Sequence, residues 1–468
     1  MNAVTDIRVE RQANAPASPW AVFFVASTAV FLVAIDGTVL FAAFPALRSG
    51  FPQSTAADLS WVLNAYTVVY AALLVPAGRL SDALGRKRMF QLGLLLFLAA
   101  SAACGAAPTV SILVAARVLQ AFGAALLTPA SLALVLGAFT TDRRAVVVSL
   151  WGAVSGLAAA LGPSLGAAVV DALGWRWAFF LNLPLGLIAW WRGRSRLTEW
   201  RDAKGDASLD GVGIGLLITA VGALAYGIVE ADVLGWRSQS VLGALSGGIL
   251  LLAVFVVWAS RRPNPAVDLS LFAEPNYRYV NLASFVFGIA FSMMFFAMFF
   301  FLMQVWHYPL PRAGLAVSPG PLLVVPVAML AGRIAARVGH RPLLVLGSLL
   351  YAAGGLWLYF RVGTTPDYLG VWLPGLLMTG TAVGMVFPSL SGAAVARLAP
   401  TRFGVGSAVN HAVRQMGSVL GVAATVAFVG HASPQIVDFR GLYATHIALA
   451  LLTALLCLRV DTRPSKPR

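Results

Sequence analysis

Charged residues are scarce in this chain, and their scarcity limits the classes of protein to which it can belong. Asp, Glu, Lys and Arg together make up 11% of the 468 residues, whereas soluble domains carry about 25%. The mean hydropathy is +0.83. These figures exclude a soluble globular enzyme, a disordered protein and a fibrous repeat, and they leave a membrane protein.

Cysteine and catalytic motifs are also nearly absent. The two cysteines, Cys104 and Cys457, lie far apart in apolar runs, so they indicate neither a disulfide framework nor a metal site. Because the sequence has no Walker loop, zinc motif or nucleophile elbow, we expect no enzyme activity, no cofactor and no metal. It also has no basic domain with interleaved aromatic residues, so the net charge of +15 does not predict nucleic-acid binding.

Apolar residues make up 59% of the chain and occur in long runs between short basic loops. Such runs predict membrane-spanning helices, because a crossing takes roughly 20 apolar residues. They exclude an outer-membrane barrel, whose strands are short and alternating. We expect an all-α polytopic membrane protein with fourteen spans, at residues 20–47, 58–79, 88–107, 110–139, 144–170, 175–192, 211–230, 239–259, 279–306, 314–336, 342–360, 368–396, 403–430 and 441–459.

Lysine and arginine set the expected orientation. With the N-terminus inside, 25 of them fall in inside segments and 6 in outside loops, which is the bias of cytoplasmic loops. Residues 1–19 are polar and do not resemble a signal peptide, so we expect a cytoplasmic tail there. Both termini are then cytoplasmic, and the Lys-poor composition rich in Ala, Gly and Arg favours a bacterial inner membrane.

Two loops share a pattern at an offset of 254 residues. Gly, Arg, an aliphatic residue and a second Gly recur in the segments 78–88 and 332–342, and Pro129 and Pro388 begin a second echo. Either Gly-Arg loops recur by chance in basic turns, or the chain is duplicated, as secondary transporters are. Duplication predicts a six-helix half at 20–200, a linker with two extra spans at 201–275, a second six-helix half at 276–460 and a tail at 461–468.

Five motifs resemble those of the major facilitator superfamily, most of all its fourteen-span drug:proton antiporter branch. They are the cytoplasmic loop 78–88, the fourth-span motif 113–125, the fifth-span exporter motif at 152–156 and 161–166, the first-span motif 35–45 and the sixth-span entry 174–186. Ala121 and Phe41 depart from the usual Gly and the frequent Asn. The resemblance covers nearly the whole chain and implies the major facilitator fold, two six-helix halves plus two linker helices.

Asp36 is the only acidic residue that lies well inside an expected span. A carboxylate in the hydrocarbon zone is costly and is by default a functional candidate. Arg117 is its obvious partner, because a proton on Asp36 would remove the attraction and free the guanidinium to move. We predict proton coupling by Asp36, Arg117 and His411, since histidine titrates near neutral pH. The alternative is a static ion pair that fixes helix packing.

A substrate cavity is predicted from one polar and one apolar set of residues. The Phe and Met side chains share a helix face and suit an adaptable pocket, and Arg414 shares a face with His411. The alternatives are lipid-facing phenylalanines and an Arg414 that reaches the cytoplasmic interface. The predicted lining is Thr38, Gln120, Phe287, Phe291, Met294, Met298 and Arg414.

Two segments are predicted to move during transport. In the cytoplasmic gating loop, Asp82 is expected to accept hydrogen bonds from N–H groups at a helix start, and Arg86 to pair with an acid across the half-interface; a solvated loop is the alternative. In the fifth span, small residues allow close approach and a proline permits a kink, with plain tight packing as the alternative. The loop residues are Gly78, Asp82, Gly85 and Arg86, and the hinge residues are Gly152, Gly156, Gly162, Pro163 and Gly166.

The residues alone indicate a duplicated multi-span protein with a few intramembrane charges. The resemblance adds proton-coupled secondary active export of hydrophobic small molecules or drugs by alternating access. We expect a monomer whose partners are the substrate, protons and the lipid bilayer. The alternatives are a transporter of a specific anionic or zwitterionic metabolite and, from other classes, a receptor or a membrane-embedded enzyme.

Overall fold

The computed structural model describes residues 18–140, 143–199, 209–398, 402–430 and 435–462. Within these ranges the chain is helical and contains no strand, which confirms the all-α class. Twelve helical stretches of the described residues are long and apolar enough to cross a membrane. The protein is therefore a multi-pass membrane protein. Most of the two predicted tails, 1–19 and 461–468, and the predicted boundary at residue 200 lie outside the described residues.

The first half of the chain forms helices at the predicted positions. Its sixth segment is broken at Leu181 into α6 and α7. The bounds are α1 Pro19–Gly50, α2 Ala56–Leu84, α3 Arg86–Ala106, α4 Val110–Ala138, α5 Arg144–Leu173, α6 Trp177–Phe180 and α7 Asn182–Arg196. The predicted segments 144–170 and 175–192 correspond to α5 and to α6 with α7, which fall outside the twelve, so the count of fourteen stays a prediction.

The rest of the chain contains the two linker helices and the second half. The proline-rich segment predicted at 314–336 is also broken, at Ser318, between α11 and α12. The bounds are α8 Gly211–Leu234, α9 Gln239–Ser260, η2 Leu269–Ala273, α10 Pro275–Phe300, η3 Phe301–Val305, α11 Leu310–Val317, α12 Pro319–Val338, α13 Arg341–Arg361, η4 Tyr368–Trp372, α14 Leu373–Val395, α15 Phe403–Val429 and α16 Ile436–Cys457.

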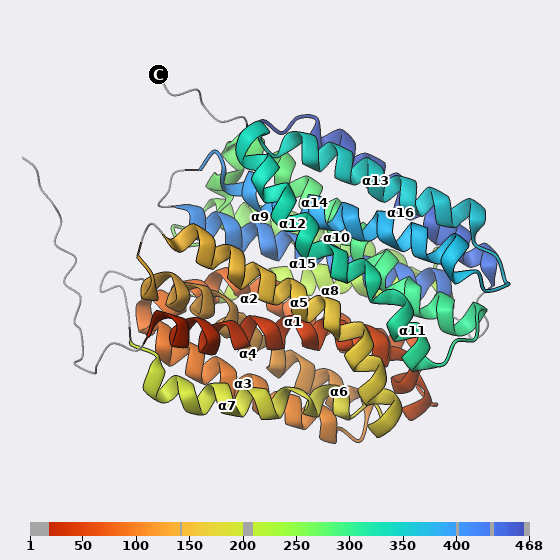
Figure 1. The fold of residues 1–468 in the computed structure, drawn as a ribbon, viewed down its shortest axis with the longest axis horizontal. Helices are drawn as coiled ribbons and strands as arrows, with labels where there is room; N and C mark the ends of the chain where they lie inside the picture. The colour runs from red at the N-terminus through yellow and green to blue at the C-terminus, as the bar shows by residue number, and fades with distance from the viewer. Residues whose placement is uncertain (1–17, 141–142, 200–208, 399–401, 431–434, 463–468) are drawn as a thin grey trace, which may run out of the picture.

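The two halves pack in the same way. In the first half α1 packs on α5 and α7, α2 on α4, and α3 on α4 and α7. In the second half α10 packs on α15 and α16, α12 on α14, and α13 on α14 and α16. Figure 1 shows the two groups side by side, the first from red to yellow and the second from green to blue. This repeated packing is what a duplicated chain predicts.

The two halves meet along a pair of equivalent seams. Helix α15 of the second half packs on α2 of the first, and α5 of the first packs on α12 of the second. In the repeat α2 corresponds to α12 and α5 to α15, so each seam joins the same two elements with the halves exchanged. We call the ends of the helices that carry the Arg-rich loops the inner ends, following the predicted orientation.

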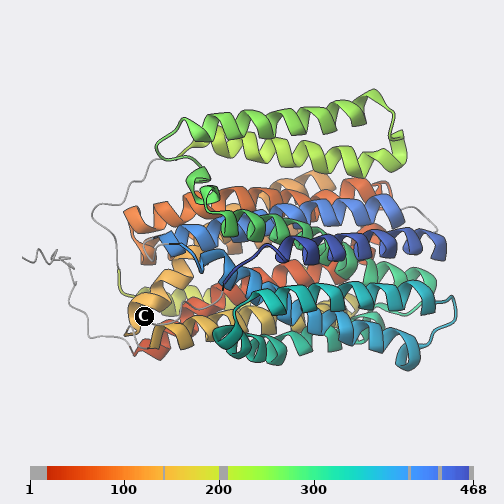
Figure 2. The ribbon, with the colours of Figure 1, turned by 90° about the horizontal axis from the view of Figure 1, so that it is seen from above.

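The extra pair α8 and α9 lies along one side of the bundle (Figure 2). Helix α8 covers α2 and α15, whereas α9 is backed mainly by α8. At the inner end Asp210 accepts hydrogen bonds from the N–H of Gly213, the indole of Trp258 and the N–H of Ala266. Burial raises the pKa of Asp210, but these bonds and the Arg262 charge outweigh it and hold the pKa below its usual value. Asp210 thus links the start of α8, the end of α9 and the segment that follows α9.

Glycines let α10 and α15 approach closely. A Cβ at Gly417 or Gly421 of α15 would run into the carbonyl oxygen of Phe285 or Ile289, and one at Gly288 of α10 would lie 2.5 Å from the Arg414 carbonyl oxygen. Such contacts are typical of small-residue faces in membranes.

Polar side chains tie the same two helices together. Asn410 donates to the Asn281 and Ser284 side chains, and the Thr425 hydroxyl donates to the Met293 carbonyl. Together with the glycine contacts, these bonds hold α15, and the polar residues it carries, in a fixed register on α10.

Adding one methyl group to this contact tests the register. Gly417→Ala is expected to lower the midpoint of thermal unfolding, because overpacking a tight contact costs about 1–3 kcal/mol. Gly215→Ala on α8 is the matched control, since its Cβ would meet nothing within 4 Å. Loss of folded protein on heating, followed by size-exclusion chromatography in detergent, measures both. Equal midpoints would contradict the packing argument.

Candidate functional site

The structure brings Asp36 and Arg117 together inside the first half. The Arg117 Nη1 donates to Asp36 Oδ2 at 2.6 Å, and both residues are 1% exposed. Asp36 lies near the middle of α1 and Arg117 in the second turn of α4. A buried pair of this kind is stable only when further hydrogen bonds satisfy both ions.

Amide side chains supply those further bonds. Gln120 Nε2 and Asn182 Nδ2 each donate to Asp36 Oδ1 at 2.9 Å, and Gln120 Oε1 accepts from Arg117 Nη1 at 2.6 Å. Both amides also donate to Ser101 Oγ, whose hydroxyl donates to the carbonyl of Phe179. The network therefore joins helices α1, α3, α4, α6 and α7. Gln120, predicted to line the cavity, is fully buried in this network.

Helix α2 satisfies the rest of the guanidinium. Arg117 Nε donates to the Val62 carbonyl at 2.9 Å, and its Cζ lies 3.9 Å from the centroid of the Tyr66 ring. A ring face attracts a cation by its quadrupole, more strongly when both are desolvated. Arg117 thus has a carboxylate, an amide, a carbonyl and a ring around it.

The hydrogen bonds around Asp36 all point toward its carboxyl group. Three donors are directed at its two oxygen atoms, which is the arrangement that suits an ionised carboxylate. Asn182 Oδ1 has no partner in the described part of the chain. Rotation of the Asn182 amide would present this oxygen to a proton on Asp36, so the network has an acceptor ready for the neutral acid.

A second polar cluster lies on the seam between α2 and α15. Arg414 Nη2 is 2.7 Å from His411 Nδ1, and His411 Nε2 is 3.5 Å from the Tyr70 hydroxyl, which bonds Thr128 at 3.0 Å. Arg414 Cζ lies 4.8 Å from the centroid of the Phe387 ring. His411 thus contacts the other half of the protein, and it is separate from the Asp36 network.

The predicted Phe and Met residues of the cavity differ in how deeply they are buried in the second half. Phe287, Met294 and Met298 are buried, and Phe287 packs on Tyr351 and Phe387. Phe291 is half-buried and packs on Phe295 and Phe387. Of the predicted set, Phe291 therefore shares an aromatic neighbour with Arg414.

Thr38 faces α5 rather than Arg414. Its hydroxyl donates to carbonyls of its own helix, and a Cβ at Gly162 would run into it, while one at Gly166 would touch Val39. The Pro163 carbonyl lies against Gly314 of α11. These contacts place the predicted hinge where α5 meets both α1 and the second half.

The rest of the predicted hinge is looser. Helix α5 runs through Pro163 without a break. A Cβ at Gly152 would meet nothing within 4 Å, and the surroundings of Gly156 lie outside what the structure describes.

The loop 78–88 has hydrogen-bond partners that differ from those predicted. Asp82 Oδ1 accepts from Nε and Nη2 of Arg86 at 3.0 and 2.8 Å, within the loop itself. The helix start is instead capped by Glu199, whose oxygens accept from the N–H groups of Lys87 and Arg88 at 3.0 Å. The prediction that Asp82 caps the helix is wrong, because Glu199 accepts from these N–H groups while Asp82 bonds the Arg86 side chain.

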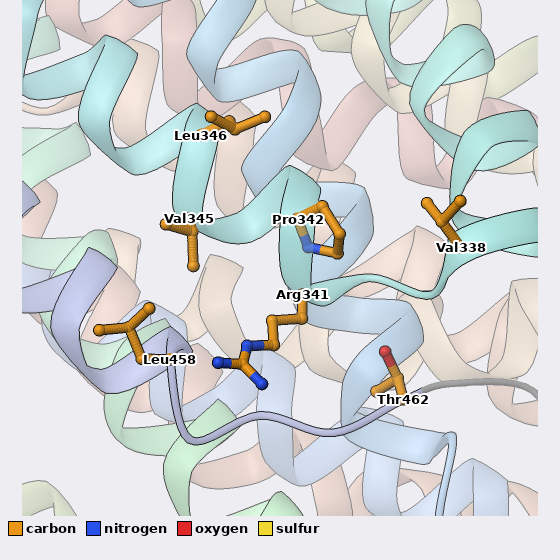
Figure 3. Close-up of a pocket in the computed structure, with 7 residues that line it drawn as sticks. All are labelled: Val338, Arg341, Pro342, Val345, Leu346, Leu458 and Thr462. Atoms are coloured by element: carbon orange, nitrogen blue, oxygen red, sulfur yellow. The ribbon is translucent and has the colours of Figure 1, made fainter.

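The repeated loop has an equivalent arrangement. Gly339, with φ 83°, ends α12 as Gly85 ends α2. The N–H of His340 donates to Thr462 Oγ1 at 2.7 Å, so the segment after α16 closes this loop as Glu199 closes the first. Beside it lies a groove of about 280 Å³ lined by Val338, Arg341, Pro342, Val345, Leu346, Leu458 and Thr462 (Figure 3). None of the predicted site residues lines this groove.

Asn182, Tyr66, Tyr70 and Glu199 were missed as functional candidates. Asn182 stands in the sixth-span motif 174–186, so its place in a resembling segment was a usable signal. Tyr66 and Tyr70 are spaced by four and stack at 5.8 Å, yet apolar α2 gave no reason to single them out.

Comparison with known proteins identifies relatives over most of the chain. The family model described as Major Facilitator Superfamily matches residues 26–422 and 280–468. The methylenomycin A resistance protein of Streptomyces coelicolor is 31% identical over 85% of this chain and 83% of its own length. The puromycin resistance protein pur8 of Streptomyces alboniger is 33% identical over 86% and 80%. A solved D-xylose-proton symporter, 14% identical, covers 96% of this chain and 98% of its own, with a TM-score of 0.68.

Removing Arg117 should expose the cost of the buried carboxylate. Arg117→Met is expected to destabilise the protein by about 3–5 kcal/mol, because an ion left alone in the interior is strongly unfavourable. Adding Asp36→Asn removes that ion and should restore part of the loss, as thermal unfolding in detergent would show. Arg361→Met, at an exposed helix end, is the control. A double variant less stable than Arg117→Met would argue against a charge penalty.

Proposed function

This chain belongs to the major facilitator superfamily, and on that premise we propose that it exports drug-like small molecules in exchange for protons. Its relatives at about 30% identity include proteins named for resistance to methylenomycin A and puromycin. Their names support export of hydrophobic small molecules by this chain. We place it in a bacterial inner membrane as a monomer with both termini in the cytoplasm and fourteen spans arranged as six, two and six.

The buried Asp36–Arg117 network is the observation that carries the proposal. The network contains a titratable carboxyl group whose two oxygen atoms both accept hydrogen bonds. It lies where five helices of one half meet. When a proton neutralises Asp36, the attraction that holds Arg117 disappears, although its bonds to Val62 and Gln120 remain. Arg117 then carries an uncompensated charge, which favours a different packing of α1 against α4.

Changes in α1 reach the second half through packed rings. Phe44 of α1 lies 4.9 Å from Phe296 and 5.6 Å from Phe300 of α10, measured between ring centroids. On the same outer side Gly314 of α11 packs on Pro163 and Ala167 of α5. Both contacts join the two halves near the ends of the helices opposite the Arg-rich loops. In the proposed cycle, protonation of Asp36 loosens them and so couples the proton to alternating access.

Asp36→Asn tests proton coupling directly. The amide keeps the size of the side chain but carries no proton or charge, so substrate binding should stay within a few-fold while a pH gradient no longer drives transport. Asp36→Glu should retain partial coupling. The measurement is export of a hydrophobic dye and proton flux in proteoliposomes with an imposed gradient. A parent protein that exports no tested compound would refute export itself.

The outcome for the variant separates coupling from export. Asp36→Asn protein that pumps dye against its gradient as well as the parent does would show that coupling lies elsewhere. His411 would then be the first candidate, because it is titratable and touches Tyr70 of the other half.

Asp82→Lys tests the proposed gating loop. It replaces the attraction to Arg86 with repulsion in a partly exposed turn, so folding and insertion should survive while transport falls nearly to background. Ser195→Lys, at the inner end of α7, is the control for added positive charge. Dye export at matched expression is the measurement. Transport by Asp82→Lys equal to that of the parent would remove the loop from the mechanism.

A further inference from the structure

We propose that Arg414 binds the acid group of the transported compound, and that this site selects aromatic acids. The inference rests on the proposed export function and names its substrate class. Its basis is a contrast between the two intramembrane arginines. Arg117 is fully compensated by Asp36 and its neighbours, whereas Arg414 has no ion pair among the described residues.

Arg414 lies deep in the bundle. Helix α15 begins at Phe403, so Arg414 is about 16 Å along it at 1.5 Å per residue. Its backbone is pressed against Gly288 of α10, and its neighbour His411 contacts Tyr70 of α2. The guanidinium is held at the seam between α15 and α2 by its bond to His411.

No carboxylate of the second half is available to Arg414. The chain after residue 262 has five acidic residues, and each lies at the end of a helix or beyond it: Asp268, Glu274, Asp367, Asp438 and Asp461. The described acid nearest mid-depth, Asp36, is already paired with Arg117. An uncompensated guanidinium at this depth is costly, and a charge that arrives with the substrate would remove that cost.

The guanidinium is presented for binding. Only Nη2 has a hydrogen bond, to His411 Nδ1, so Nε and Nη1 have no partner in the described structure. His411 must accept at Nδ1, because arginine has no acceptor, and it is therefore neutral here. Nη2 carries a second N–H, and this N–H together with that of Nε or of Nη1 forms the parallel pair of donors that a carboxylate needs for a bidentate bond.

Aromatic rings surround the same position. Phe387 lies under Arg414 at 4.8 Å and packs on Phe291 at 4.9 Å between centroids. Tyr70 covers the seam from α2, with its ring edge-to-face on His411. Arg414, Phe387 and Phe291 are all half-buried. A flat aromatic ring bearing an acid group would place the ring on the phenylalanines and the charge on Arg414.

The test compares an aromatic acid with its neutral amide. Coumarin-3-carboxylate and coumarin-3-carboxamide are titrated onto the purified full chain, and fluorescence anisotropy gives the two dissociation constants. The parent should bind the acid about tenfold or more tightly, as expected for a desolvated charged hydrogen bond. Arg414→Gln should lose this preference and keep the amide affinity within about twofold, which also shows that the variant is folded. Arg361→Gln, whose guanidinium stacks on Trp357, should keep it.

Each outcome separates this proposal from the export function. Equal affinities in the parent, no binding of the acid, or a preference that persists in Arg414→Gln would overturn the role of Arg414. Displacement of the acid by inorganic phosphate at equal concentration would overturn the aromatic selectivity. Export of a neutral dye by proteoliposomes that contain the parent protein reports on the proposed function independently. Either proposal can therefore fail while the other stands.

Discussion

A guanidinium group at mid-depth in a membrane has to be compensated, and this constraint shapes both polar clusters. In the first half, the charge of Arg117 requires Asp36, and Asp36 in turn requires the amides of Gln120 and Asn182. Because these donors come from different helices, the ion pair fixes how the half is assembled. In the second half Arg414 has no acidic partner among the described residues, and we propose that the substrate supplies the compensating charge.

Duplication gives the protein two copies of one plan, and function follows from where the copies differ. The packing of the halves, the seams α2–α15 and α5–α12, and the glycine turns at Gly85 and Gly339 all repeat. The charges do not. Asp36 has no counterpart at mid-depth in α10, whose residues there are apolar or small. The first half therefore holds the mid-depth carboxylate, and the second half holds an arginine that has no ion pair among the described residues.

Sequence analysis could predict the helical class and the repeat, because both depend on patterns along the chain. It could also predict the pairing of Asp36 with Arg117, because only one partner was available for the carboxylate. The intramembrane charges are so few that Arg117 was the obvious partner. It could not predict the cap of α3, because Glu199 lies more than a hundred residues from Lys87. The partners of Gln120 could not be predicted for a similar reason: its position on α4 is clear, but which neighbour it faces depends on how α1, α3 and α7 meet.

Helix α2 connects the two clusters through a pair of stacked rings. The Tyr66 ring lies against Arg117, it stacks on Tyr70 at 5.8 Å, and Tyr70 contacts His411, which bonds Arg414. A displacement of Arg117 would remove the guanidinium from the face of the Tyr66 ring. A resulting shift of Tyr66 would also shift Tyr70, which stacks on it and contacts His411. Since Tyr70 belongs to the first half and His411 to the second, the same contact must break or slide whenever the α2–α15 seam opens. Protonation at Asp36 and release of an anion from Arg414 can thus share one moving element, which physical coupling between two distant sites requires.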